Sequence, residues 1–167
     1  GVGEATVPTL VRYHQLLDVN EQEFLAAVQG TFKLGIAFEN WRDVNEDYIH
    51  SFGDTGRDHW SAGFQHFWMK GREKGIASEF GDYCLELKAA QESKFAHLPR
   101  PGINYAFHID ATLYARFLRQ FSEKFGATRV EGKIVRINTN SETGFIESLT
   151  LDSGRNVEGD LFIDCSG

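Results

Sequence analysis

The sequence has few cysteines, prolines and methionines, and it contains no long hydrophobic run. Its 167 residues include two cysteines, three prolines and one methionine. Cys84 and Cys165 are far apart, and the absence of a CxxC motif or a His/Cys cluster argues against a disulfide framework and a zinc site. No apolar stretch approaches the roughly 20 residues that a membrane-spanning helix needs. These absences predict a protein of the reducing cytoplasm without a membrane partner.

Basic residues are fewer than acidic ones, with 17 Lys and Arg against 24 Asp and Glu. The net charge is -7 and the isoelectric point is near 5.3, so the average field would repel nucleic acid and anionic membrane surfaces. By contrast, 41% of the residues are hydrophobic, which is enough for one substantial core. Aromatic residues make up 13% of the chain. They could line a pocket for a flat ligand or fill the core, and composition leaves both possibilities open.

The first half of the chain is predicted to contain three helices and two strands. Pro8 suits the first turn of a helix, and Asn20 followed by Glu23 is typical of a capping box that opens a second helix. Alternating hydrophobic residues predict strands, and an amphipathic pattern closed by Gly75 predicts the third helix. The expected ranges are 8–17, 21–30, 32–41, 48–52 and 60–74.

In the second half, a loop is predicted over residues 94–104 and a long helix over residues 111–125. Asp110 would cap this helix and Gly126 would end it. Three runs with β character follow, separated by turn sequences at 142–144 and 152–154, which predicts an antiparallel meander. The expected strands are 129–138, 145–151 and 161–164. The fold class is therefore mixed α/β.

The opening segment Gly1-Val2-Gly3-Glu4-Ala5-Thr6 is a candidate ligand-binding segment. Two glycines directly before a helix N-terminus let backbone N–H groups approach a cofactor or an anion closely. An ordinary tight turn before a helix explains the same residues.

Lys33 is a candidate catalytic residue. It shares a predicted strand face with Gly35 and Ala37, whose small side chains leave space beside its amine. A desolvated amine could act as an acid, a nucleophile or a hydrogen-bond donor. The alternative is a solvated lysine on the wet face of an antiparallel strand.

His50 and Phe52 share a face of their short strand and could offer a polar group and an aromatic surface to one ligand. A structural histidine beside a core phenylalanine is the alternative. Residues 161–167 form an apolar run that ends in small residues, as at the ligand-binding edge of open α/β sheets. The histidines show no HxH or HExxH spacing, so no metal site is expected.

Taken in order, these segments resemble the flavin-dependent tryptophan halogenases over essentially the whole chain. The matching segments are GVGEAT at 1–6, the FK to NW strand at 32–41, YIHSFG at 48–53, YAFHIDA at 105–111, RVEGKI at 129–134 and DLFIDCSG at 160–167. The stretch from Glu79 to Pro101 resembles the family only loosely, which leaves the substrate open.

The resemblance implies roles for particular residues. Lys33 would be the catalytic lysine, and His50 and Phe52 would border the indole pocket. The residues that would contact FAD are Val2, Gly3, Glu4, Ala5, Ile134, Asp164 and Gly167. The implied fold is the FAD-dependent monooxygenase-like, glutathione-reductase-type flavoprotein fold, present in part.

The resemblance also implies a two-component reaction. A separate flavin reductase would supply reduced FAD, and oxygen with chloride or bromide would give hypohalous acid, which Lys33 would present to a small aromatic substrate. The family's GxGxxG and WxWxIP motifs and its catalytic glutamate are missing from these 167 residues. Residues 1–167 are therefore expected to be part of a single FAD-binding domain, truncated at both ends. An FAD-dependent aromatic hydroxylase and an inactive fragment are the alternatives.

Overall fold

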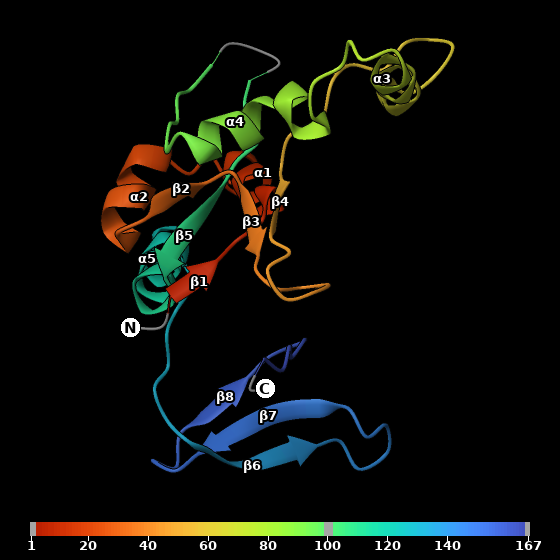
Figure 1. Cartoon of the computed structure of the whole chain (residues 1–167). Coiled ribbons are helices and arrows are strands. Elements are labelled where there is room, and N and C mark those ends of the chain that lie inside the picture. The colour runs from red at the N-terminus through yellow and green to blue at the C-terminus, as the bar shows by residue number, and fades with distance from the viewer. Residues whose placement is uncertain (1–2, 99–101, 166–167) are drawn as a thin grey trace. The chain divides into compact units, whose positions relative to one another are not determined.

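A computed structural model describes residues 3–98 and 102–165 (Figure 1). The chain divides into two compact units, residues 1–121 and residues 122–167, and each is described by itself. Within the described ranges, none of the helices combines the length and the hydrophobicity needed to cross a bilayer.

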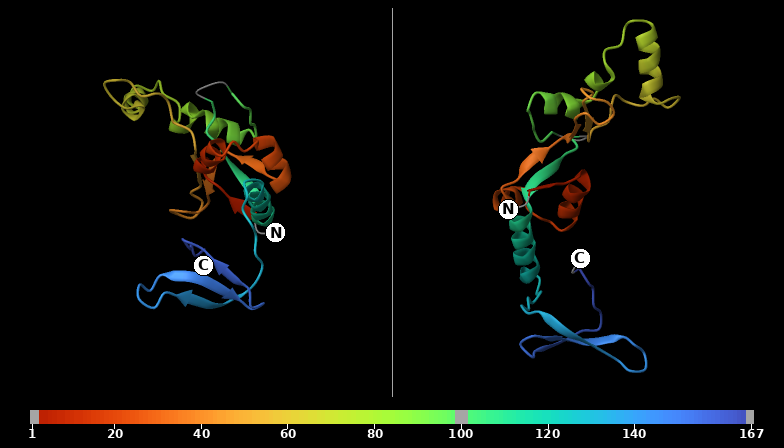
Figure 2. Two further views of the ribbon diagram at one scale, coloured as in Figure 1. Left: turned by 180° about the vertical axis from the view of Figure 1, so that it is seen from behind. Right: turned by 60° about the horizontal axis from the view of Figure 1, so that its bottom comes forward.

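The first unit is organised around β5 (Ala106–Asp110), the middle strand of a three-stranded antiparallel sheet (Figures 1 and 2). β1 (Gly3–Ala5) pairs with it on one side and β2 (Thr31–Lys33) on the other. β5 was not predicted as a strand from the sequence. Its residues Ala106, Phe107 and Ile109 are buried, because the strand is paired along both edges and Phe107 and Ile109 face the core.

Three helices pack against the face of this sheet that carries Phe107 and Ile109, and all three were predicted. They are α1 (Pro8–Leu16), α2 (Glu21–Val28) and α5 (Ala111–Lys124). Asn20 Oδ1 accepts hydrogen bonds from two backbone N–H groups of the first turn of α2, at 3.0 and 3.1 Å, and Asp110 Oδ1 accepts one from Leu113 at 2.9 Å. Both predicted N-caps are confirmed.

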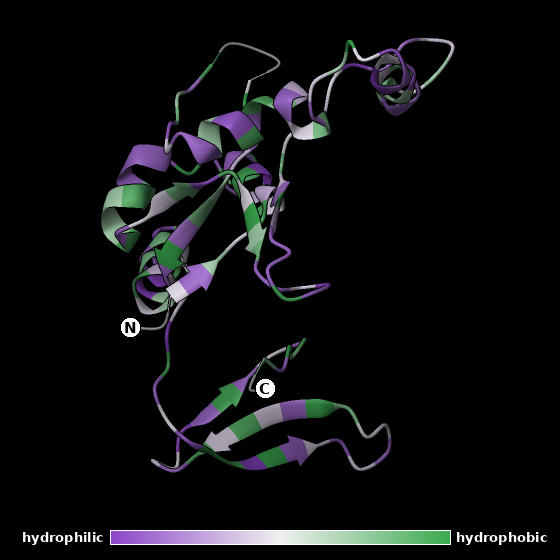
Figure 3. Ribbon diagram, in the orientation of Figure 1, coloured by the Kyte–Doolittle hydropathy of each residue, from purple (hydrophilic) through white to green (hydrophobic). Residues whose placement is uncertain are grey.

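The core of the first unit lies between these helices and the sheet. Phe24 of α2 is fully buried, and its ring meets those of Phe107 and Phe117 edge to face at 5.2 and 5.5 Å. Hydrophobic and hydrophilic residues alternate around α5, so one side of this helix faces the core (Figure 3). The buried members of the core are Val11, Phe24, Val28, Phe107 and Ile109.

The predicted single strand over residues 32–41 is wrong, because the structure has two strands there. β2 ends at Lys33, and β3 (Gly35–Phe38) pairs with β4 (Tyr48–Ser51) in a separate hairpin. The chain passes from one sheet to the other at the buried residue Leu34, whose carbonyl accepts a 2.8 Å hydrogen bond from Phe52 N–H. Alternation of hydrophobic residues continues through this change of partner, so the pattern could not reveal it.

The segment after the hairpin contains α3 (Phe64–Glu73), η1 (Phe80–Tyr83) and α4 (Leu85–Gln91). The predicted start of α3 at Trp60 is wrong, since that residue is 91% exposed and lies before the helix. The helix begins where Asp58 Oδ1 accepts the N–H of Phe64 at 2.7 Å. Neither η1 nor α4 was predicted, and α4 packs against β3 and β4.

The second unit is the expected antiparallel meander, formed by β6 (Ile134–Thr139), β7 (Ile146–Leu151) and β8 (Asn156–Glu158). The third strand differs from the prediction, because residues 161–164 are not in a strand. The turn at Gly154, with φ of +83°, returns the chain at once into β8. Leu161 and Ile163 are 79% and 80% exposed. The predicted mixed α/β class is confirmed.

Candidate functional site

Lys33 ends β2 and is only 7% exposed. Its Nζ donates a 2.9 Å hydrogen bond to the backbone oxygen of Thr6. Thr6 is itself held on β5, since its N–H and its hydroxyl both donate to the carbonyl of Phe107, at 2.9 and 3.0 Å. The amine therefore has a fixed position, and the alternative of a solvated surface lysine is wrong.

The ring of Phe52 covers the amine from the neighbouring hairpin, with Lys33 Nζ 5.3 Å from its centroid. A cation over an aromatic face is favoured electrostatically. Burial acts in the opposite direction, because removal from water penalises the charged form, and it lowers the pKa of Lys33. The site therefore holds a larger share of neutral amine than an exposed lysine would at the same pH.

A cavity of about 420 Å³ borders Lys33. Phe32 and Phe95 form part of its lining, and their rings stack 3.7 Å apart at an angle of 12°. The carboxylate of Glu21 binds two residues whose rings contact Phe32 and Phe95. Tyr105 OH donates a 2.6 Å hydrogen bond to one of its oxygens, and His97 Nε2 lies 3.0 Å from the other. Burial and the Glu21 carboxylate both raise the pKa of Tyr105. The hydroxyl of Tyr105 thus remains protonated and continues to donate its hydrogen bond to Glu21.

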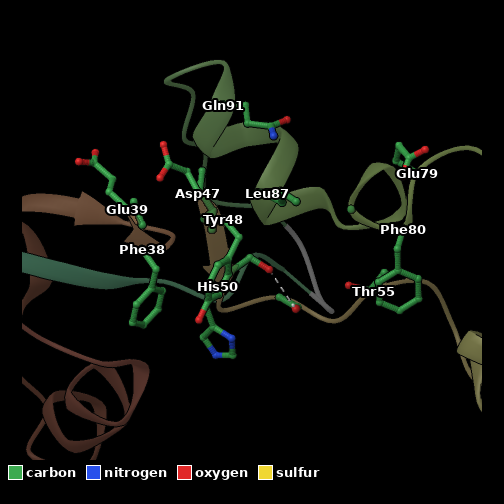
Figure 4. A pocket seen from close by; sticks show the side chains of 15 residues that line it. Phe38, Glu39, Asp47, Tyr48, His50, Thr55, Glu79, Phe80, Leu87 and Gln91 are labelled. Carbon is green, nitrogen blue, oxygen red and sulfur yellow. Dashed lines mark hydrogen bonds between the residues drawn. The ribbon is translucent and has the colours of Figure 1, made fainter. Parts of the chain in front are cut away.

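His50 lines a different cavity, of about 860 Å³. Figure 4 shows His50 with Phe38, Tyr48 and Phe80 around this space. Phe38 and Tyr48 stack with their ring centroids 4.9 Å apart. The structure thus brings Lys33 and Phe52 together, whereas His50 is exposed and its ring points away from Leu87 and Gln91 (Figure 4).

The predicted cofactor segment is an exposed edge strand. The residues Gly3–Ala5 of β1 are all exposed, and in the described ranges β1 pairs with β5 alone. A Cβ added to Gly3 would meet no other described residue within 4 Å. A glycine without such neighbours lets a ligand approach the backbone closely. Val2 lies outside the described residues.

The remaining predicted cofactor residues belong to the second unit. Ile134 begins β6 and is 51% exposed, and Asp164 is exposed. Gly167 lies outside the described residues.

Glu86, a buried residue that contacts Gly53 beside Phe52, was not among the predicted site residues. Glu86 is 5% exposed, and its Oε1 accepts a 2.8 Å hydrogen bond from Asn104 N–H. Its Oε2 lies 3.9 Å from Sγ of the buried Cys84. No pattern could have identified it, because a glutamate in the first turn of a helix is ordinarily a solvated residue that complements the helix dipole.

Comparison with known proteins identifies the relatives of this chain. The sequence model of the tryptophan halogenase family matches residues 1–167. Among curated proteins, the chain is 34% identical to the tryptophan 6-halogenase ThaL of Streptomyces albogriseolus and 33% identical to the tryptophan 7-halogenase RebH of Lentzea aerocolonigenes. Each match covers 100% of this chain and 35% of the relative. The chain thus spans about a third of the length of these relatives.

Solved structures that are similar to this chain are also halogenases. Xcc4156, a flavin-dependent halogenase from Xanthomonas campestris, matches with a TM-score of 0.96 and 63% identity. BrvH, a flavin-dependent halogenase from Brevundimonas, matches with a TM-score of 0.92 and 40% identity. Both matches cover 100% of this chain, and they cover 34% and 35% of the two structures. The partial flavoprotein fold implied by the sequence resemblance is confirmed.

Proposed function

The chain belongs to the tryptophan halogenase family, and on this premise we propose that its protein halogenates tryptophan or another indole with FADH2, O2 and halide. The observation that carries the proposal is the buried amine of Lys33, held between the Thr6 carbonyl and the Phe52 ring. A hydroxylase that shares the nucleotide-binding parts has no need for an amine at this place. The geometry therefore favours halogenation.

FAD is proposed to lie along Gly3–Ala5, where the exposed edge of β1 offers backbone groups and open space. Val2, Ile134, Asp164 and Gly167 are proposed as further contacts. When bound in its reduced form, FAD would supply electrons that reduce oxygen to the peroxide level, at which it can oxidise halide to hypohalous acid. We further propose that both units belong to a single FAD-binding domain.

Lys33 is proposed to receive the hypohalous acid in one of two ways. The ammonium form can donate a hydrogen bond to the oxygen of the acid and orient it. The neutral form can attack the halogen, in which case an N–halogen bond forms, the halogen–oxygen bond breaks, and the amine proton leaves with hydroxide as water. The burial that lowers the pKa of Lys33 favours the second route. In both routes the fixed Nζ presents an electrophilic halogen at one place.

The aromatic substrate is proposed to lie between Lys33 and side chains of the β3–β4 hairpin, with Phe52 and His50 as binding residues. A ring held against Phe52 would offer one carbon to the halogen, which gives regioselectivity. The required partners are a separate flavin reductase and chloride or bromide. Both cysteines are free thiols, and we assign the protein to the reducing cytoplasm.

The test uses the full-length protein with FAD, a flavin reductase, NADH and bromide or chloride. Halogenated tryptophan or indole is measured by mass spectrometry for the parent protein and for Lys33→Ala. We expect the variant to lose at least 100-fold of the product while FADH2 oxidation by oxygen continues. Lys74→Ala is the matched control, because Lys74 is an exposed lysine at the end of α3.

Two results would contradict the proposal. Halogenation by Lys33→Ala at the parent rate would remove the assigned role of the amine. A hydroxylated product formed equally well without halide would identify the protein as a hydroxylase.

A further inference from the structure

Glu86 occupies a place where a carboxylate is costly. It lies in the first turn of α4 and is 5% exposed. A buried carboxylate needs hydrogen-bond donors to offset the loss of hydration. The N–H of Asn104 donates to Oε1 at 2.8 Å, and Sγ of the buried Cys84 lies 3.9 Å from Oε2. The interactions of Glu86 thus reach beyond its own helix.

The carboxylate of Glu86 also fills the space beside Gly53. A Cβ added at Gly53 would overlap both carboxylate oxygens of Glu86. Gly53 is not among the glycines with positive φ, so the missing side chain, rather than the backbone conformation, explains why glycine suits this position. Glu86 and Gly53 are therefore complementary in shape.

Phe52 stands between two residues that contact the segment 84–86. On one side, Ser51 Oγ lies 3.0 Å from Cys84 Sγ, and on the other, Gly53 packs on Glu86. Phe52 itself donates its N–H to the carbonyl of Leu34, the residue after Lys33. The backbone that carries the Phe52 ring is thus fixed from both directions.

Glu86 also contacts the segment that leads into β5, the strand that pairs with the strand of Lys33. Asn104, which donates to Glu86, stands two residues before Ala106, and Ala106 is the partner of Lys33 in the pairing of β2 with β5. One carboxylate therefore joins the segment that carries Phe52 to the segment that leads into the strand beside Lys33.

We propose that Glu86 is a positioning residue that holds the Phe52 ring over the amine of Lys33. The carboxylate needs no contact with substrate for this role. It sets the distance between the two groups through Gly53 and through the backbone of Asn104. The consequence for halogenation rests on the proposed function, whereas the position of the ring does not.

The ring current of Phe52 provides a direct test in the full-length protein. The εCH2 signal of Lys33 is recorded with ¹³C-labelled lysine and assigned by its loss in Lys33→Met. Phe52→Leu gives the position of this signal without the ring. We expect Glu86→Ala to move the signal at least halfway to that position. Glu86→Gln, which keeps the volume and an acceptor oxygen for Asn104, should leave it near the parent position.

Gly53→Ala gives a second, independent perturbation. The added methyl group competes with the Glu86 side chain for one space, so the signal should move in this variant as well. In the double variant Gly53→Ala/Glu86→Ala the competition is gone, so the effects should not be additive. Glu73→Ala in the exposed part of α3 is the matched control and should leave the Lys33 signal unchanged.

Product formation is measured on the same variants. We expect Glu86→Ala to lower kcat at least tenfold with a smaller change in KM, and Glu86→Gln to restore kcat to within threefold of the parent. An unmoved Lys33 signal in Glu86→Ala, or additive effects in the double variant, would overturn the positioning role. If the parent protein forms no halogenated product, the proposed function fails, while the signals of Lys33 still decide the role of Glu86.

Discussion

Lys33 Nζ and the backbone oxygen of Thr6 are joined by a 2.9 Å hydrogen bond. Thr6 directly follows β1, the strand proposed to lie along FAD, and Lys33 ends β2, so the cofactor segment and the candidate catalytic amine belong to one sheet. Because the acceptor is a backbone oxygen, no side-chain substitution at Thr6 removes it. The position of the amine therefore depends on the pairing of these strands with β5.

The first prediction concerns the titration of Lys33. Burial lowers its pKa below the ordinary value of 10.5, so its εCH2 signal should titrate at a lower pH than those of exposed lysines. The folded state then binds this proton more weakly than the unfolded state does. Lys33 should oppose folding below its folded pKa, and this effect should disappear as the pH rises toward 10.5.

Two measurements check this prediction. The titration is followed by NMR with ¹³C-labelled lysine, and lysine in the unfolded protein serves as the reference. The free energy of unfolding of the parent protein should also rise with pH relative to Lys33→Met in the alkaline range. A Lys33 titration that coincides with that of lysine in the unfolded protein would show that the amine is solvated.

The second prediction concerns the Phe52 ring. A cation over an aromatic face is stabilised by the ring quadrupole. Phe52→Leu removes the ring face that favours the charged amine, so the pKa of Lys33 should fall further below its ordinary value. Phe52→Tyr keeps an aromatic face and should stay close to the parent value. An equal shift in both variants would mean that packing, rather than the ring quadrupole, sets the pKa.

The helices α1, α2 and α5 were predictable from the sequence, because their signals are local. Asn20 and Asp110 cap helices through hydrogen bonds to residues two or three positions away. A short stretch of sequence therefore contains both partners of each contact. Strand partners depend on residues far away in the chain. The break at Leu34, where consecutive strands join different sheets, and the missed strand β5 are both of this kind.

The candidate site was predictable only in part. Alternation alone left a solvated Lys33 as an alternative, and the family resemblance pointed to it as the catalytic residue. The burial of the Lys33 amine depends on Thr6 and Phe52, which lie 27 residues before it and 19 residues after it in the chain. Glu86 gave no signal, because its burial comes from contacts with Gly53 and Asn104 that no local pattern encodes.

The third prediction concerns the core of the first unit. Phe24 is fully buried and contacts aromatic rings of β5 and α5. Phe24→Ala should lower the free energy of unfolding by about 3–5 kcal/mol, as is usual when a buried ring leaves a cavity. Phe67→Ala on α3, where the side chain is 49% exposed, should have a much smaller effect. Denaturant unfolding of the full-length variants measures both, and equal losses would contradict the assigned core.

The last prediction is a pH dependence of stability that originates at His14. His14 is 4% exposed, its Nε2 shares a 2.9 Å hydrogen bond with Tyr114 OH, and its Nδ1 has no hydrogen-bond partner among the described residues. Burial lowers its pKa below 6.5, although the charge of Glu21 acts in the opposite direction. A protonated imidazole would carry its charge in a buried place, where the loss of hydration penalises it more than the charge of Glu21 stabilises it.

The sign follows from this lowered pKa. Between the folded pKa and 6.5 the unfolded state binds the proton and the folded state does not, so stability should fall as the pH drops through this window. The slope cannot exceed about 1.4 kcal/mol per pH unit for one group, and it should vanish below the folded pKa. His14→Gln keeps an acceptor for Tyr114 and does not titrate, so its unfolding free energy should lack this component. His66→Gln, an exposed control on α3, should retain it, and identical pH profiles for the parent protein and His14→Gln would show that the buried imidazole is not its source.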